Sequence, residues 1–561
     1  MPHRPRTDLS RKLRALERRL ANLLKGRKVS FEVKTNTARA PTRGGIARCG
    51  VAEVEITPEE YIGLAGYSKA GKIAKGTRYP LFARALYLED SGGNKAALCF
   101  LDLWCASRYL LHTVALQTLT GASGLAASQL ILAGTHTHAG PGRYFGNHLY
   151  DTVVSKDCGF DKEVAYFLVG RIADCVNQAA KSAVPARLGI ASAPVWYVSR
   201  NRARPAFLEN PEAASWNLDG PGQGAPPDLP DVSHFAIDPR VFCLTAVSAD
   251  ANAKLLGAFA TFSCHATALG LNNDQYDPDW PRVACEVAAQ QLAAGGASPI
   301  VALADSGGAD ITPMQCDEQH GAALVQSVGK GVGDGIAAAA QQAIKNAADF
   351  TVEMHFAELS PSGADTHLAC LEPPFTTPPQ PWAIGVTTIG GATDGHSGFN
   401  VSDSNVGKDF DHRDPQFPKT LAFGSVGQAL LRLIFQLAPA SVLPLHTLKV
   451  AGHQFATFPG EPTITTAFRL EKALKAATGA ASASIIGYAG DYSGYYPTHE
   501  EYMLQRYEGA SMIRGRHASQ EISDALVRLA SGRLPFTLPP AVKFSRLDPP
   551  ARKPRRRVAR I

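Results

Sequence analysis

Several features that would assign a protein to a class at once are missing from this sequence. Among its 561 residues there is no apolar run of about 18 residues, so we expect no membrane-spanning helix. The amino-terminal stretch MPHRPRTDLSRKLRALERRL lacks the apolar core of a secretory signal, which favours a cytoplasmic location. The ten cysteines include no C-x-x-C pair, and several sit in apolar runs. They are expected to be small buried side chains in a reducing compartment rather than a disulfide framework.

Common catalytic motifs are also missing. The sequence contains no H-E-x-x-H, no G-x-S-x-G and no Walker A pattern, which excludes the helical zinc-peptidase site, the nucleophile elbow and the P-loop. The glycine-rich stretch GKGVGDG at 329–335 does not match G-x-G-x-x-G and lies inside a helical pattern. We also find no internal repeat. The chemistry of this chain must therefore come from residues that the fold brings together.

Charge is distributed unevenly along the chain. The net charge is +6, yet residues 1–43 alone carry +10 and residues 552–560 carry +6, so the body between them is acidic. An acidic body gives no reason to expect nucleic-acid binding. The basic ends could contact an anionic membrane, as could the amphipathic helix expected at 9–24, whose leucines recur at helical spacing. Alternatively, the ends are solvated tails, and that helix pairs with a partner or packs on its own domain.

Between the two basic ends, strand-like and helix-like patterns alternate without a clean linker. Residues 46–57 alternate as an opening strand, and helices are expected at 109–120, 161–182, 282–294, 320–346, 463–477 and 518–531. This mixture predicts an α/β fold, with one large mixed, layered α/β domain over residues 45–535. Residues 1–44 are predicted to form a basic extension that contains the amphipathic helix, and residues 536–561 a basic tail.

The stretch ILAGTHTHAGPG, residues 131–142, places His136 and His138 two positions apart behind an apolar run. Residues at i and i+2 of a strand point to the same face, so the two rings can converge on one point beyond the strand end. Neutral imidazole is a good zinc ligand, and this pair can begin a metal site. The alternative is a pair of satisfied polar histidines at the end of a strand.

Four other segments put polar, reactive residues at the ends of apolar runs. FSCHATALG carries His265, and ADITPM carries Thr312. FPGEPT carries Glu461, with Thr463 placed to cap a helix. The fourth segment, residues 487–511, is dense in tyrosine and acidic residues. Taken singly, each has a structural alternative: a buried core histidine, a residue in a tight turn, a charge at the start of a helix, or core aromatics.

Taken together and in order, these segments resemble the neutral (alkaline, non-lysosomal) ceramidase family. THTHAGPGRY is similar to the family's T-H-T-H-S-G-P-G segment, and NRARPAFLENP to its N-R-S-x-x-A-Y-L-x-N-P segment. FSCHATALG resembles the segment with the family's second zinc histidine, and GGATDG resembles G-T-T-D-G. FPGEPTITTAFRL and YSGYYPTHEEYMLQRYEGAS resemble its last active-site segments. The likeness runs from about residue 48 to about residue 515, and its last segment is long and specific.

The resemblance implies a zinc-dependent hydrolase that cleaves the amide bond of N-acylsphingosine (ceramide), or of a related N-acyl amide, into a fatty acid and an amine. It implies one Zn²⁺ per chain at the centre of the domain, and a sphingolipid or other N-acyl amide as the substrate. The implied metal ligands are His136, His265, Glu461 and Tyr495. The implied catalytic residues, which contact the substrate or the developing charge, are His138, Arg202, Thr312 and Tyr507.

Three departures from the family pattern bear on the substrate. Thr312 stands where the family has serine, so the hydroxyl is kept but a β-branch is added, and Met314 replaces an asparagine. DPDWPRVA at 277–284 replaces a D-N-K-G turn, and the stretch after YEGAS is too short for a full immunoglobulin-like domain of ~100 residues. Two other functions therefore stay open: a metal-dependent amidase or esterase with a small non-ceramide substrate, and a catalytically impaired lipid-binding homologue.

Overall fold

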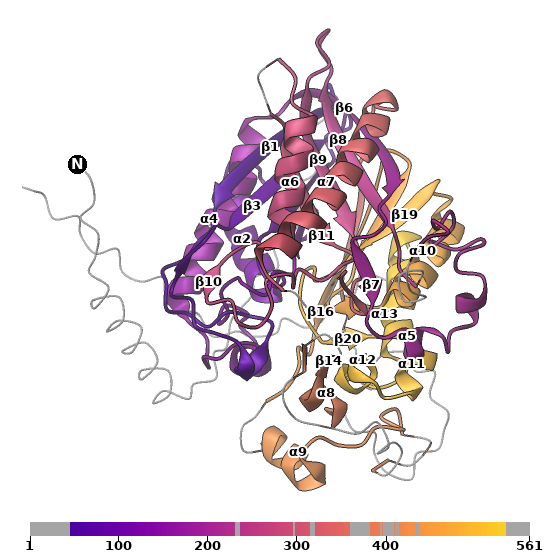
Figure 1. Cartoon of the computed structure of the whole chain (residues 1–561). Helices are drawn as coiled ribbons and strands as arrows, with labels where there is room; N and C mark the ends of the chain where they lie inside the picture. The colour runs from indigo at the N-terminus through magenta and orange to yellow at the C-terminus, as the bar shows by residue number, and fades with distance from the viewer. Residues whose placement is uncertain are drawn as a thin grey trace, which may run out of the picture.

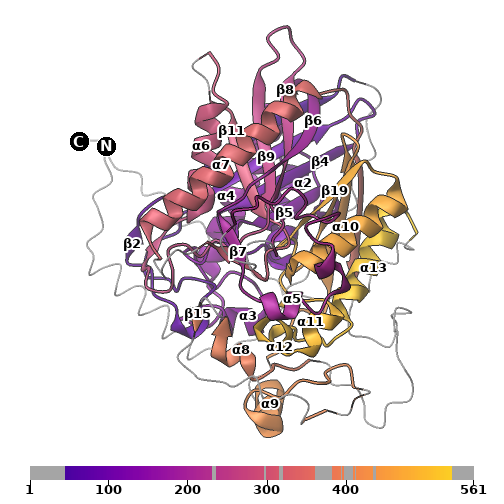
Figure 2. The same ribbon diagram turned by 45° about the vertical axis from the view of Figure 1, so that its right-hand side comes forward.

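The computed structural model shows a layered α/β fold. It describes residues 45–229, 236–295, 298–314, 320–359, 382–392, 395–396, 409–410, 412, 414–433 and 437–533. The basic extension predicted at 1–44 and the basic tail predicted at 536–561 lie outside these ranges, so both stay predictions. The predicted fold class is confirmed: two sheets pack face to face, and helices cover both outer faces (Figures 1 and 2).

The larger sheet has eight strands in the order β11-β9-β8-β6-β1-β3-β4-β5. In chain order these strands are β1 (Arg48–Glu55), β3 (Phe82–Glu89), β4 (Lys95–Leu101), β5 (Leu130–Gly134), β6 (Val184–Pro194), β8 (Arg240–Ser248), β9 (Leu255–Phe262) and β11 (Ile300–Asp305). β1 lies antiparallel to β3 and β6, whereas β4–β5 and β9–β11 are parallel pairs at the two edges. Apolar side chains fill both faces of these strands, because both faces of the sheet are covered.

Four helices cover one face of this sheet. α2 (Arg108–Thr120) and α4 (Lys162–Lys181) pack beside β1, β3 and β5, and α6 (Trp280–Gln291) and α7 (Ala322–Lys345) pack beside β6, β8 and β11. In α4, buried residues recur every three or four positions, and Asp161 caps the first turn by accepting from two backbone N–H groups. The helices predicted at 109–120, 161–182 and 320–346 are confirmed.

The opposite face packs on a second sheet of four strands, in the order β13-β16-β17-β19. The strands are β13 (Glu353–Leu359), β16 (Leu443–Val450), β17 (His453–Thr457) and β19 (Ser482–Ile486), and α10 (Ile464–Thr478) and α13 (Ala518–Ala530) cover their outer face. The helices predicted at 463–477 and 518–531 are confirmed. α6 begins before the predicted residue 282, because Pro281 is tolerated in a first helical turn and Asp279 caps that turn.

Shorter elements fill the connections. They are η1 (Ser68–Ala70), β2 (Gly76–Thr77), η2 (Ala127–Gln129), α3 (His148–Val153), β7 (Ser199–Asn201), α5 (Arg204–Phe207), η3 (Pro211–Ala214), β10 (Gln275–Tyr276), β12 (Ile311–Pro313), α8 (Thr387–Gly390), β14 (Gly391–Ala392), β15 (Gly395–His396), α9 (Gly424–Leu433), β18 (Glu461–Pro462), β20 (Tyr495–Tyr496), α11 (His499–Met503) and α12 (Tyr507–Ser511). Within the described ranges, no helix is both long and apolar enough to cross a membrane. The eight cysteines in these ranges are all free; seven are buried, as predicted, and Cys158 is exposed.

Close packing of the helices on the central sheet depends on glycine. A Cβ added at Gly189 of β6 would lie 1.9 Å from the carbonyl oxygen of Ala343 in α7. We expect Gly189→Ala to lower the free energy of unfolding by about 1–3 kcal/mol, because the helix must move away from the strand. Urea unfolding of the purified protein measures this loss.

Gly170→Ala is the matched control for this substitution. Gly170 lies inside α4, and a Cβ added there would meet no atom within 4 Å outside the helix's own backbone. The same change should therefore raise the free energy of unfolding by about 0.5–1 kcal/mol, because alanine has a higher helix propensity than glycine. Equal effects of the two substitutions would show that the contact between α7 and β6 does not limit the packing.

Candidate metal centre

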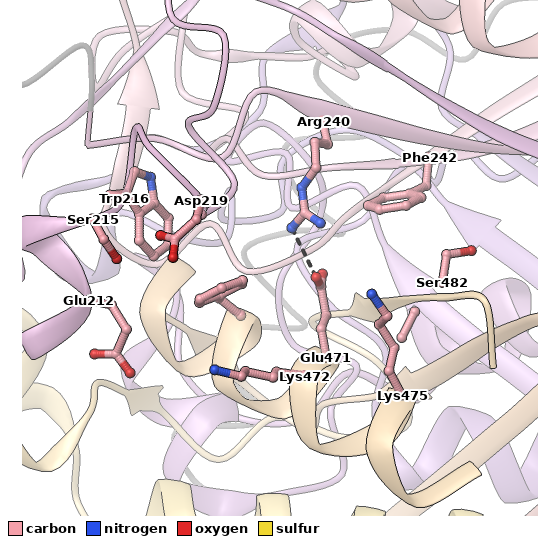
Figure 3. A pocket seen from close by; sticks show the side chains of 13 residues that line it. Glu212, Ser215, Trp216, Asp219, Arg240, Phe242, Glu471, Lys472, Lys475 and Ser482 are labelled. Atoms are coloured by element: carbon pink, nitrogen blue, oxygen red, sulfur yellow. Dashed lines mark hydrogen bonds and ion pairs between the residues drawn. The ribbon is translucent and has the colours of Figure 1, made fainter. Parts of the chain in front are cut away.

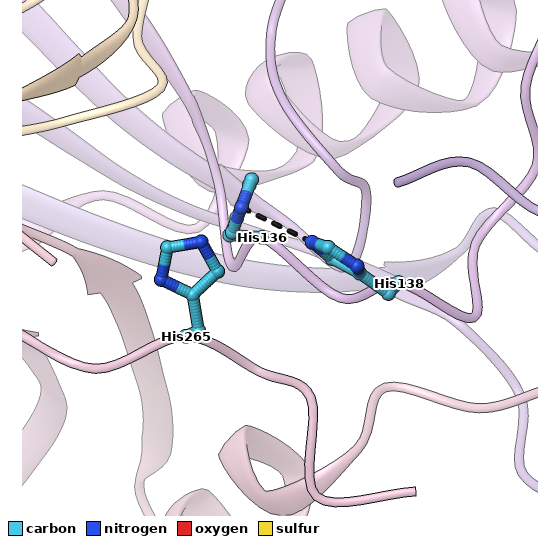
Figure 4. Close-up of side chains that lie close together, drawn as sticks. All are labelled: His136, His138 and His265. Atoms are coloured by element: carbon cyan, nitrogen blue, oxygen red, sulfur yellow. Dashed lines mark hydrogen bonds between the residues drawn. The ribbon is translucent and has the colours of Figure 1, made fainter. Parts of the chain in front are cut away.

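Three histidines from distant parts of the chain meet in one cluster. The ligand nitrogens of His136, His138 and His265 lie within 4.8 Å of one another (Figure 4). His136 and His138 follow β5, and His265 follows β9. Elsewhere in the part of the chain that the structure describes, no group of three or more histidine, cysteine or acidic side chains meets at this spacing. The cluster is therefore the candidate metal centre.

His136 and His138 converge for a reason other than the predicted one. β5 ends at Gly134, and His136 has a φ of 61°, so neither ring projects from a strand. The backbone turns instead, which brings Nε2 of His138 to 3.2 Å from Nε2 of His136. A positive φ in a residue with a side chain is strained, and such strain clusters at functional sites. The predicted strand geometry is wrong, although the two rings do meet.

Backbone carbonyls fix the orientation of the two fully buried rings. Nδ1 of His136 donates to the carbonyl oxygen of Trp104 at 2.9 Å, and Nδ1 of His265 donates to that of Gly308 at 2.7 Å. Because a carbonyl can only accept, each ring carries its proton on Nδ1 and points the lone pair of Nε2 into the cluster. Burial lowers the pKa of His136 well below its usual value, against the opposing charge of Glu461, so this ring is neutral.

Glu461 adds a buried carboxylate to the cluster. It lies on β18, and its Oε2 is 3.2 Å from Nε2 of His265 and 3.8 Å from Nε2 of His136. Three atoms that carry lone pairs thus face one another inside the protein. Such atoms repel one another in a medium of low dielectric constant unless a cation or a proton lies between them. The two imidazoles and the carboxylate could therefore hold a metal ion.

Tyr495 and Tyr507 lie beside this group. Parallel pairing of β18 and β20 places Tyr495 directly opposite Glu461, and the Tyr495 hydroxyl donates to the hydroxyl of Tyr507 at 3.4 Å. Burial, followed by the charge of Glu461, raises the pKa of Tyr495 well above its usual value, so the phenol keeps its proton. Tyr507 begins α12, and the guanidinium of Arg202 lies 5.6 Å from the centre of its ring.

Arg202 reaches the cluster from the segment after β7. Its Nη2 lies 3.4 Å from Nε2 of His265 and donates to the carbonyl oxygen of Ala309 at 2.7 Å. Its Nε donates to Glu508 at 3.2 Å, and both side chains of this ion pair are 5% exposed. A fixed guanidinium therefore lies next to the imidazoles, and Glu508, which the sequence analysis did not select, balances its charge.

His138 is held differently from the other two histidines. Its ring packs edge-on against Tyr67, and a Cβ added at Gly66 would lie 2.4 Å from its Cγ. Its Nδ1 is buried and makes no hydrogen bond within the described part of the chain. Burial, and then the neighbouring His265 and Arg202, lower its pKa well below the usual value, so the ring is neutral. Its Nε2 can either donate to His136 or share a cation with it.

Thr312 follows a residue that is hydrogen-bonded to the backbone of His265. It sits in β12, which pairs with β7, and the carbonyl of the preceding Ile311 accepts from the backbone N–H of His265 at 3.1 Å. The Thr312 side chain is fully buried, and its hydroxyl has no hydrogen-bond partner among the described residues. Such a hydroxyl costs about 1–3 kcal/mol of stability, so folding alone does not explain its presence.

Glu461 is surrounded by aromatic side chains that the sequence alone did not single out. Tyr492 donates to Oε1 of this carboxylate at 2.5 Å, and Tyr488 donates to Oε2 at 3.4 Å. The ring of Tyr488 also stacks on His136, with 3.8 Å between the ring centres. Both residues lie in the tyrosine-rich segment 487–511. Its composition is a signal of function, but it does not tell which ring faces the carboxylate.

A separate cavity of about 340 Å³ lies against α10 (Figure 3). Trp216, Phe242 and Arg240 line it, whereas the three histidines do not. Arg240 donates to Asp238 at 2.6 Å and to Glu471 at 2.9 Å, so carboxylates of the protein already neutralise its charge. The groups suited to chemistry are in the histidine cluster rather than in this cavity.

Comparison with known proteins identifies relatives over nearly the whole chain. The family model described as neutral/alkaline non-lysosomal ceramidase, N-terminal, matches residues 48–327 and 340–523. Neutral ceramidase B of Dictyostelium discoideum is 24% identical to this chain over an alignment of 564 positions, which covers 91% of this chain and 76% of the relative. The neutral ceramidase of Pseudomonas aeruginosa is 26% identical over an alignment of 503 positions, which covers 83% of this chain and 69% of the relative.

Solved structures share the fold. A structure described as ceramidase complexed with C2 matches 89% of this chain and 78% of its own, with a TM-score of 0.72 and 23% identity. Neutral ceramidase from Pseudomonas aeruginosa matches 89% of this chain and 76% of its own, with a TM-score of 0.69 and 22% identity. The resemblance seen in the sequence is confirmed, and with it the predicted class of enzyme, a ceramidase-like amidohydrolase. This chain belongs to the neutral/alkaline non-lysosomal ceramidase family.

Proposed function

We propose that this protein hydrolyses the amide bond of ceramide, or of a closely related N-acyl amide, with the help of one bound Zn²⁺. Membership of the ceramidase family supports the class of substrate. The observation that carries the proposal is the convergence of Nε2 of His136, Nε2 of His265 and Oε2 of Glu461 inside the protein, at 3.2–3.8 Å between carboxylate and imidazoles. The products are a fatty acid and a sphingosine-like amine.

The donor set fits zinc. Imidazole together with carboxylate oxygen is typical of zinc sites, whereas Mg²⁺ and Ca²⁺ favour oxygen ligands alone. We assign His136, His265, Glu461 and Tyr495 as the ligands. The backbone carbonyls that accept hydrogen bonds from Nδ1 orient the two imidazoles. When bound, zinc polarises the amide carbonyl and lowers the pKa of a bound water to about 7.

Four neighbouring side chains supply the other catalytic functions. Arg202 would hydrogen-bond the amide oxygen as negative charge develops on it. The Tyr507 hydroxyl would be a second donor, and its ring centre lies 5.6 Å from the same guanidinium. His138 would donate a hydrogen bond from Nε2 to the oxygen on which negative charge develops. The unpartnered hydroxyl of Thr312 would hydrogen-bond the substrate or the attacking water.

Hydrolysis of a fluorescent short-chain ceramide by the purified full chain tests the proposal. Release of the labelled fatty acid, with a lower rate for N-acyl amides that lack the sphingoid part, is the expected result. Cleavage of small amides or esters but not of ceramide would favour the alternative substrate. Metal and ceramide binding with no cleavage of any substrate would favour a catalytically impaired lipid-binding homologue.

The cytoplasmic location and the contact of the basic ends with a membrane stay predictions from the sequence. Anionic vesicles test the second of these. If residues 1–43 hold the protein at a membrane, deleting them lowers vesicle binding, since those residues carry a net charge of +10. Unchanged vesicle binding would contradict the prediction.

A further inference from the structure

The two oxygens of Glu461 have different surroundings. Oε1 accepts the Tyr492 hydroxyl at 2.5 Å, a short and strong hydrogen bond to a carboxylate. Oε2 is the oxygen that lies near His136 and His265, and the Tyr488 hydroxyl reaches it only at 3.4 Å. One oxygen is thus engaged within the protein, and the other faces the cluster.

Tyr492 is a rigid donor. Its ring packs on Trp104, with 4.2 Å between ring centres, and edge-on against Tyr150 at 4.9 Å, and the residue is 5% exposed. The phenol cannot swing away from Glu461 without disturbing the packed core around it.

Trp104 couples this donor to one of the imidazoles. Its carbonyl accepts from Nδ1 of His136 at 2.9 Å, while its ring packs on Tyr492. The same residue therefore orients His136 through its backbone and the donor to Glu461 through its side chain. Trp104 therefore fixes the positions of His136 and Tyr492 relative to each other, although the two residues come from different parts of the chain.

From this geometry we infer that Tyr492 is a positioning residue that makes Glu461 a one-oxygen ligand, by holding Oε1 and leaving Oε2 free for the metal. The inference rests on the proposed function, because it needs a metal ion in the cluster. A carboxylate that binds through one oxygen leaves a coordination position for water or substrate, whereas binding through both oxygens would fill that position. Tyr492 would thereby keep the reaction site open.

Zinc binding to metal-free Tyr492→Phe tests the inference without relying on activity. Loss of an outer hydrogen bond to a metal ligand typically weakens binding, and we expect the zinc dissociation constant to rise about 10–100-fold. Competition with a chromophoric chelator measures this constant. Thermal melting of the metal-free variant shows whether the fold is kept, since the ring and its packing remain.

Tyr150→Phe is the matched control. Tyr150 is a buried tyrosine that packs on Tyr492, and its hydroxyl has no hydrogen bond among the described residues. The same chemical change there should leave the zinc dissociation constant within about twofold of the wild-type value. An equal loss of affinity in both variants would mean that general packing, rather than the bond to Glu461, sets zinc affinity, and it would overturn the inference.

Cobalt(II) substitution gives a second readout that does not depend on affinity. Cobalt(II) absorbs visible light less strongly as its coordination number rises, so a carboxylate that gains a second bond weakens the absorption. We expect weaker absorption in Tyr492→Phe and an unchanged spectrum in Tyr150→Phe. An unchanged spectrum and affinity in Tyr492→Phe would refute the inference but leave the proposed function standing. A wild-type protein that binds neither metal would refute both.

Discussion

Replacement of His136 by alanine is expected to remove the bound metal and to lower ceramide hydrolysis by about 10³-fold or more. Several kcal/mol of transition-state stabilisation are lost with the metal, and each 1.4 kcal/mol corresponds to about tenfold in rate. His136 is fully buried, and its Nε2 points into the cluster opposite Glu461. Alanine supplies no donor atom there, and the remaining residues cannot move into its place through a packed interior.

Metal content by elemental analysis, together with the rate of hydrolysis, measures this effect. His355→Ala serves as the control, because His355 lies on β13 and pairs with Glu353 away from the cluster. The control should keep about one zinc per chain and the wild-type rate. Retention of zinc and of activity in His136→Ala would contradict the ligand assignment.

Thr312→Val is expected to lower the rate of hydrolysis by about 10²–10³-fold while leaving the protein as stable as the wild type, or more stable. A loss of this size is typical when an enzyme loses one hydrogen-bond donor to the charge that develops in the transition state. The stability should not fall, because the Thr312 hydroxyl is buried without a partner in the described chain and valine has nearly the same shape. Function and stability are thus predicted to change in opposite directions, which a purely structural threonine would not show.

Thr312→Ser separates the hydroxyl from the methyl group. The serine variant keeps the hydroxyl and should hydrolyse ceramide within about tenfold of the wild-type rate, at a stability cost of about 1 kcal/mol for the lost methyl. Parallel measurement of the rate and of urea unfolding checks both variants. Full activity of the valine variant would show that the hydroxyl takes no part. Hydrolysis by the serine variant alone would show that the wild-type chain is the impaired homologue.

Structural features that depend on residues close together in the sequence could be predicted. The helix that begins at Ile464 has its cap at Thr463, as expected, because an N-cap threonine accepts a backbone N–H within its own turn. The strand Leu130–Gly134 is buried at every position, as the apolar run before the two histidines indicates. Such signals are local, since periodicity and capping depend on residues a few positions apart.

The geometry of the site could not be predicted in this way. The approach of Glu461 to His265 joins residues far apart in the chain. Each was a candidate from its own segment, but only the family resemblance put both at one site. The left-handed turn at His136 replaces the expected strand geometry, because tertiary contacts hold a backbone conformation that local preference disfavours. Tyr492 and Tyr488 donate to Glu461, and the composition of their segment does not tell which of its tyrosines do so.

Zinc titration of the metal-free full chain, followed by the rate of ceramide hydrolysis, tests the central claim most directly. We predict no hydrolysis without metal, a rate that rises in proportion to bound zinc, and saturation at one zinc per chain. Full hydrolysis by the metal-free protein, or none at saturating zinc, would contradict a metal-centred ceramidase built on His136, His265 and Glu461.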